Sequence, residues 1–139
     1  MLKQASSTLD EEQVRTPPRR RVLVVDDNVD AAATLAQLVQ LLGHDTVVAY
    51  DGLQAIEAAR TGRFDIVLLD LGMPNLDGIE TARRLRAAPG GARLFIAAVT
   101  GWGQESDRAR TRQAGFDLHL VKPVPVDVLT RVLEKPHPS

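Results

Sequence analysis

The sequence predicts an α/β protein built on one parallel sheet of five strands, with helices on both faces. Short apolar runs alternate along the chain with segments whose apolar residues have helical spacing, an order typical of parallel sheets with crossover helices. The run over residues 66–69 (IVLL) is uninterrupted, as expected of a strand buried on both faces. Glycine, proline or aspartate stands at most junctions, where turns and helix caps favour these residues.

The expected elements follow from these patterns in chain order. Strands are expected over residues 22–25, 46–49, 66–69, 94–99 and 118–121. Helices are expected from 29 to 42, from 51 to about 62, from 77 to before Pro89, over 104–114 and over 125–134. Gly43 is expected to end the first helix, and Asp51 and Asp77 are expected to cap the second and third.

Length and composition limit the class of protein. A chain of 139 residues with 44% hydrophobic content suits one soluble globular domain. The net charge of -1 gives no case for nucleic acid or an anionic membrane as partner. The absence of cysteine excludes disulfides and cysteine-ligated metals. No apolar run approaches a membrane span and no signal peptide opens the chain, so a cytoplasmic protein is expected.

Three parts are expected along the chain. Residues 1–20 are polar and contain an acidic run and a Pro-Pro pair, which predicts a disordered N-terminal arm or linker. Residues 21–134 form the domain, and residues 135–139 form a flexible tail. The basic cluster at 19–21 is interpreted as the solvated end of the linker, with contact to an acidic partner as the alternative.

Polar side chains follow four of the five predicted strands. Asp26 and Asp27 follow the first, Asp70 the third, Thr100 the fourth and Lys122 the fifth. In a parallel sheet these strand ends share one edge, so the side chains are expected to converge. Clustered carboxylates repel unless a hard cation joins them, and oxygen ligands suit Mg²⁺. An aspartate can attack phosphorus, while a lysine and a hydroxyl bind the oxygens of the transferred group.

With these residues the chain resembles the receiver domain of two-component response regulators, and most of all the receivers of hybrid histidine kinases. The matching motifs are Val22-Leu23-Val24-Val25-Asp26-Asp27-Asn28, Leu69-Asp70-Leu71-Gly72-Met73-Pro74-Asn75-Leu76-Asp77-Gly78, Val99-Thr100-Gly101 and Val121-Lys122-Pro123. They span nearly the whole chain in the family's order. The resemblance implies the flavodoxin-like (βα)5 receiver fold, with strand order 2-1-3-4-5.

The resemblance also implies a role for each acidic residue. Asp70 is expected to be the phosphoacceptor. Asp26, Asp27 and Asp70 are expected to hold Mg²⁺, with the backbone carbonyl of Gly72 as a further ligand. Taken alone, the stretch around Asp70 fits a strand-end turn aspartate equally well, and the rest of the pattern favours the functional interpretation.

Further roles are implied for the residues around the later strands. Lys122 is expected to pair with the phosphoryl group, and the peptide bond before Pro123 is expected to be cis. Thr100 is expected to bond the phosphoryl group and move its loop. The family's usual switch position, three residues before the lysine, holds His119 instead of Tyr or Phe. A polar ring there predicts a shallower change on phosphorylation, and strand alternation places it beside the preceding helix.

The implied function is acceptance of a phosphoryl group on aspartate from a histidine kinase or a histidine phosphotransfer protein. Only 17 residues follow Lys122, so no DNA-binding domain is expected and output would come through protein docking. The docking face is expected on residues 104–114, 118–121 and 125–134. The chain is expected to assist its own phosphorylation and dephosphorylation without being a conventional enzyme, and to bind neither nucleic acid nor membrane.

Two other functions remain as alternatives. A non-phosphorylated pseudo-receiver would serve only as a protein-interaction module, but such proteins usually lack one of the site residues. An aspartate-nucleophile phosphatase resembles an Asp-x-Asp pattern, whereas here the second position after Asp70 is Gly72.

Several other residues have plain structural interpretations. His44 follows a helix-ending glycine and is interpreted as a solvated turn residue, and His137 as part of an unstructured tail. Trp102 either covers the pocket or is an exposed loop residue. The arginines of the third predicted helix are interpreted as a solvated face, with a partner surface as the alternative; they are Arg83, Arg84 and Arg86.

Overall fold

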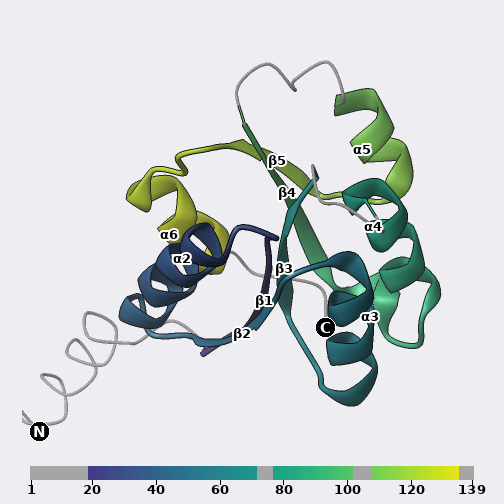
Figure 1. Ribbon diagram of the computed structural model, residues 1–139, viewed down its shortest axis with the longest axis horizontal. Helices are drawn as coiled ribbons and strands as arrows, with labels where there is room; N and C mark the ends of the chain where they lie inside the picture. The colour runs from purple at the N-terminus through teal and green to yellow at the C-terminus, as the bar shows by residue number, and fades with distance from the viewer. Residues whose placement is uncertain (1–18, 72–76, 102–107, 135–139) are drawn as a thin grey trace, which may run out of the picture.

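The computed structural model describes residues 19–71, 77–101 and 108–134, with side chains omitted over 108–110 (Figure 1). Its elements, in chain order, are β1 (Arg21–Val25), α2 (Val29–Leu41), β2 (Asp45–Ala49), α3 (Gly52–Thr61), β3 (Ile66–Asp70), α4 (Gly78–Ala87), the short 3-10 helix η1 (Gly91–Arg93), β4 (Phe95–Thr100), α5 (Arg108–Ala114), β5 (Leu118–Val121) and α6 (Val126–Glu134). Within these ranges no helix is long and apolar enough to cross a membrane.

The strands form one parallel sheet in the order β2-β1-β3-β4-β5. This confirms the flavodoxin-like receiver fold predicted from the sequence. Along β1, Val24 pairs with Val48 of β2 on one side and with Leu68 of β3 on the other. Because all strands run in one direction, their carboxyl ends lie along a single edge of the sheet.

Two hydrophobic cores cover the two faces of the sheet. Alternate residues of each strand point to opposite faces, so Leu23 and Val25 enter one core while Val22 and Val24 enter the other. Helices α3, α4 and α5 supply buried residues to the first core, and α2 and α6 to the second. Figure 1 shows the same division, with α2 and α6 together on one side of the strands. The buried runs predicted from the sequence are therefore the central layer of a three-layer sandwich.

Local signals define the helix ends. The side chains of Asp51 and Asp77 accept hydrogen bonds from Gln54 N and Glu80 N, as expected of N-caps. Gly43, just after the C-cap of α2, has φ of 100°, a conformation that suits glycine. The observed strand bounds differ from the predicted ones by at most one residue at either end.

The interpretation of His44 as a solvated turn residue is wrong. The turn is present, but the His44 side chain is only 3% exposed, and its Nδ1 accepts a hydrogen bond from Arg20 N. Arg20, placed by the sequence in a solvated linker end, is part-buried, and its Nε donates to Leu133 O. These contacts join residues far apart in the chain, so local sequence gave no sign of them.

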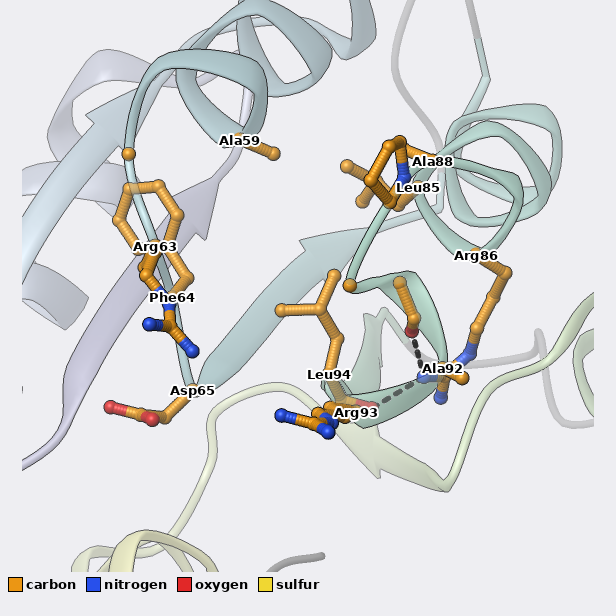
Figure 2. A pocket seen from close by; sticks show the side chains of 14 residues that line it. Ala59, Arg63, Phe64, Asp65, Leu85, Arg86, Ala88, Ala92, Arg93 and Leu94 are labelled. Carbon is orange, nitrogen blue, oxygen red and sulfur yellow. Dashed lines mark hydrogen bonds between the residues drawn. The ribbon is translucent and has the colours of Figure 1, made fainter. Parts of the chain in front are cut away.

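The interpretation of Arg86 as part of a solvated face is also wrong. Its guanidinium donates to the carbonyls of Gly91, Leu94 and Gly115, and pairs with Asp117 at 2.6 Å. Arg86 lines a hollow with a volume of about 750 Å³ at the amino ends of β3 and β4. Figure 2 shows its side chain among those that line this hollow. Arg86 thus ties the end of α4 to the loops before β4 and β5, whereas Arg83 and Arg84 are exposed and pair with Glu80.

Candidate functional site

Three carboxylates meet at the carboxyl edge of the sheet. Oxygen atoms of Asp26, Asp27 and Asp70 all lie within 4.8 Å of one another. Asp26 is 4% exposed, Asp70 is half-buried, and Asp27 is open to solvent. The convergence predicted from the strand ends is therefore present, and the site is reachable from outside.

The backbone around Asp26 holds its carboxylate in place. Asp26 N donates to Ala49 O at 3.1 Å, which extends the ladder between β1 and β2 by one residue. Its Oδ1 accepts from Asn28 N at 3.0 Å. The Asn28 side chain in turn caps α2 by accepting from Ala31 N at 2.9 Å. The Asp-Asp-Asn sequence thus ends the strand, orients one carboxylate and begins the helix.

Lys122 brings a positive charge to this cluster. Its Nζ lies 2.8 Å from Asp26 Oδ2 and 3.9 Å from Asp70 Oδ2. Its backbone N donates to Thr100 O at 2.7 Å, which fixes the start of the loop after β5. The Lys122–Pro123 peptide bond is cis, as predicted. The Lys122 ammonium therefore binds mainly the Asp26 carboxylate and lies close to the Asp70 carboxylate.

Thr100 is the last residue of β4 and its hydroxyl points toward β5. Thr100 Oγ1 and His119 Nε2 share a hydrogen bond of 3.0 Å, and the Leu120 carbonyl oxygen is 3.4 Å from the same hydroxyl. His119 also lines a small hollow with Thr111 and Phe116, which places it beside α5 as the strand alternation predicted. The sequence predicted that both residues lie near the site, but it did not predict the hydrogen bond between them.

The start of α4 lies directly against the end of β3. A Cβ on Gly78 would come within 2.7 Å of Asp70 O and of Leu71 Cα, both of them backbone atoms. Only glycine allows this approach without moving one of the two segments. Gly78 N also donates to Leu71 O at 3.3 Å. This close packing fixes the position of the end of β3, where Asp70 lies, relative to the start of α4.

The donor set fits a hard divalent cation. Two carboxylates about 5 Å apart repel by roughly 3 kcal/mol at an effective dielectric constant of about 20. Lys122 supplies one positive charge against three negative ones, so the cluster keeps a net negative charge. All three side chains offer oxygen, the ligand that Mg²⁺ prefers in proteins. Gly72, predicted as the backbone ligand, and Trp102 lie outside the described residues.

An apolar cleft beside the cluster was missed by the sequence reasoning. It has a volume of about 570 Å³ and opens between α2 and the loop after β5. Its lining joins Asp26 and Lys122 of the cluster to apolar side chains; these include Ala31, Leu35, Leu38, Val99, Pro123 and Val124. Leu35 and Leu38 of α2 lie on the apolar side of that helix but are only partly buried against the second core, so they also face the cleft.

Comparisons with known proteins agree with this geometry. A family model described as "Response regulator receiver domain" matches residues 22–134. The gliding motility regulatory protein of Myxococcus xanthus is 37% identical over 124 residues, covering 88% of this chain but only 16% of that protein. This chain therefore spans about a sixth of that relative's length.

Two solved structures extend the comparison. The receiver domain of the sensor histidine kinase PA1611 of Pseudomonas aeruginosa, with magnesium in its active-site cleft, has a TM-score of 0.77 at 32% identity, covering 84% of this chain and 96% of that one. The receiver domain of Saccharomyces cerevisiae Ssk1, crystallised with the phosphotransfer protein Ypd1, has a TM-score of 0.76 at 26% identity, covering 86% and 89%. With its fold, its site and these likenesses taken together, the chain belongs to the receiver domain family of two-component response regulators.

Proposed function

We propose that this chain accepts a phosphoryl group on Asp70. One Asp70 carboxylate oxygen attacks the phosphorus of a phosphohistidine; a P–O bond forms, the P–N bond breaks, and the imidazole leaves with the electron pair. The observation that carries the proposal is the meeting of Asp70 with two further carboxylates and Lys122.

The remaining residues have defined tasks in this proposal. Asp26, Asp27 and Asp70 would hold Mg²⁺, as the donor set allows and as the magnesium-containing relative suggests. The cation supplies positive charge for the phosphoryl oxygens. Lys122 stands 3.9 Å from Asp70, close enough to turn from Asp26 to a phosphoryl oxygen on Asp70.

The partner proposed as phosphodonor is a histidine kinase or a histidine phosphotransfer protein. The apolar cleft beside Asp26 and Lys122 offers a surface on which the donor's helix could pack. Val29 and Val126, the first residues of α2 and α6, are 59% and 52% exposed. The complex of Ypd1 with the Ssk1 receiver shows that a relative binds such a protein. Output would follow from docking on α5, β5 and α6.

The experiment measures phosphorylation by acetyl phosphate with intact-mass detection, with and without Mg²⁺. The wild-type chain should gain one phosphoryl group, the reaction should need Mg²⁺, and Asp70→Asn should not be labelled. Asp30→Asn is the matched control, since Asp30 is an exposed carboxylate at the edge of the same cleft.

The same assay separates the alternatives. A pseudo-receiver would show no mass change at all. A phosphatase would consume acetyl phosphate over many turnovers without holding the group. The proposed phosphoacceptor consumes about one equivalent quickly and then only as fast as its own acyl phosphate hydrolyses.

A further inference from the structure

A buried histidine lies at the opposite end of the sheet from the carboxylate cluster. His44 stands just before β2, and its side chain is 3% exposed. Its Nδ1 accepts a hydrogen bond of 3.0 Å from the backbone N–H of Arg20. A ring nitrogen that accepts carries no proton, so His44 is neutral here, with its proton on Nε2.

Arg20 connects this histidine to two other elements. Its carbonyl accepts from Asp45 N at 3.0 Å, at the start of β2. Its Nε donates to Leu133 O at 3.2 Å, in the last turn of α6. One residue therefore joins the segment leading into β1, the first residue of β2 and the end of α6. The hydrogen bond to His44 is the part of this junction that depends on a titratable group.

Charged groups of both signs surround His44: Arg20 and Arg19 lower its pKa, whereas Glu134 and Asp45 raise it. Arg19 and Arg20 come from the segment before β1, Asp45 from β2 and Glu134 from α6. Arg19 and Asp45 form an ion pair at 2.8 Å, so the negative charge of Asp45 is directed mainly to Arg19 and less to His44. Burial first, and then the charge of Arg20, lower the pKa of His44 below its ordinary value. A proton added to Nδ1 would meet the Arg20 N–H donor head-on.

We propose that His44 is a pH-sensitive latch: its neutral ring holds the segment before β1 against β2 and α6, and protonation releases that segment. The folded state binds fewer protons than the unfolded state between the lowered pKa and about 6.5. The latch therefore holds fully above about pH 6.5 and weakens as the pH falls below that value. The carboxyl edge of the sheet, which holds the carboxylate cluster, keeps its structure because the latch lies at the amino end.

Amide hydrogen exchange of Arg20 reads the latch directly. In the full chain, exchange at pH 5 and pH 8 is followed by NMR and corrected for the intrinsic rate. The corrected protection of Arg20 N–H should fall roughly threefold to tenfold at pH 5, the loss expected for one hydrogen bond. The amide of Leu68, in the central strand, exchanges only when the chain unfolds, so its protection should not fall by a larger factor than that of Arg20. Equal corrected protection of Arg20 at both pH values overturns the proposal.

His44→Asn supplies the decisive variant, because its Oδ1 replaces Nδ1 as an acceptor that does not titrate. Its Arg20 protection should be the same at both pH values, and a fall like that of the wild type contradicts the latch. Nitrogen-15 shifts of the His44 ring give a second readout on the wild-type chain. They should show the proton on Nε2 at pH 8; a proton on Nδ1 rejects the proposal even if the variant does not fold.

Discussion

Arg86→Met tests the set of hydrogen bonds, here called the clamp, by which Arg86 joins the end of α4 to the loops before β4 and β5. The wild-type guanidinium donates to three carbonyls and pairs with Asp117, and its side chain is only 20% exposed. Asp117 Oδ2 also accepts from Ile96 N at 2.8 Å, so the clamp reaches the start of β4. Methionine keeps the apolar stem of the side chain and removes every one of these donors.

The magnitude follows from the number of bonds lost. A hydrogen bond from a charged donor contributes about 1.5 kcal/mol at the low end, so four amount to roughly 6 kcal/mol. Gly91 and Leu94, which supply two of the accepting carbonyls, line the hollow beside Arg86, so water can reach these carbonyls once the side chain is gone. We therefore expect Arg86→Met to lower the free energy of unfolding by about 3 kcal/mol, a large part of the usual 5–15.

Urea denaturation followed by circular dichroism measures this change. Arg83→Met is the matched control, three residues away on the same helix, with an exposed ion pair to Glu80 at 3.8 Å. Exposed pairs contribute about 0–1 kcal/mol, so the control should be nearly neutral. A destabilisation by Arg86→Met no larger than that of Arg83→Met would refute the clamp.

Three other changes test the site. Asp27→Ala should weaken Mg²⁺ binding in calorimetry at least tenfold while leaving the melting temperature unchanged or raised, because it removes a like charge; unchanged affinity contradicts the metal site. Gly78→Ala should lower the free energy of unfolding by about 2 kcal/mol through the backbone clash and slow phosphorylation, whereas Gly101→Ala, whose added Cβ meets none of the described atoms within 4 Å, should leave the free energy of unfolding unchanged. His119→Phe removes the hydrogen bond to Thr100, so the conformational change caused by beryllofluoride should reach its midpoint at a roughly threefold lower concentration. Fluorescence or NMR titration measures this midpoint; an unchanged midpoint removes His119 from the switch.

The sheet was predictable because its information is local. Each strand is a short apolar run. In a run such as 66–69 every residue is buried, and burial of the side chains specifies the strand register strongly. Caps such as Asp51 and Asp77 were equally predictable, since the capping bond reaches only three residues along the chain. The convergence of Asp26 and Asp70 followed once the strands were known to be parallel.

The errors came from contacts between distant segments. His44 sits in the predicted turn, yet its burial depends on Arg20, which lies 24 residues earlier. Arg86 bonds backbone carbonyls, and carbonyls carry no residue-specific signal in a sequence. The bond between Thr100 and His119 likewise requires the register of β4 against β5, in which His119 pairs with Ala98. The spacing of apolar residues predicts which face of a helix or strand a residue lies on, but it does not predict which distant residue that side chain contacts.

The most direct test of the proposed function is to locate the phosphoryl group. The chain is phosphorylated with acetyl phosphate and Mg²⁺, the acyl phosphate is reduced with borohydride, and the modified residue is identified by tandem mass spectrometry. Reduction converts a phosphorylated aspartate to homoserine, so the position is recorded in the sequence itself. We expect homoserine at Asp70 alone, with Asp26 and Asp27 intact. Homoserine at either of the other two carboxylates, or a chain that yields none, would contradict the assignment of Asp70 as phosphoacceptor.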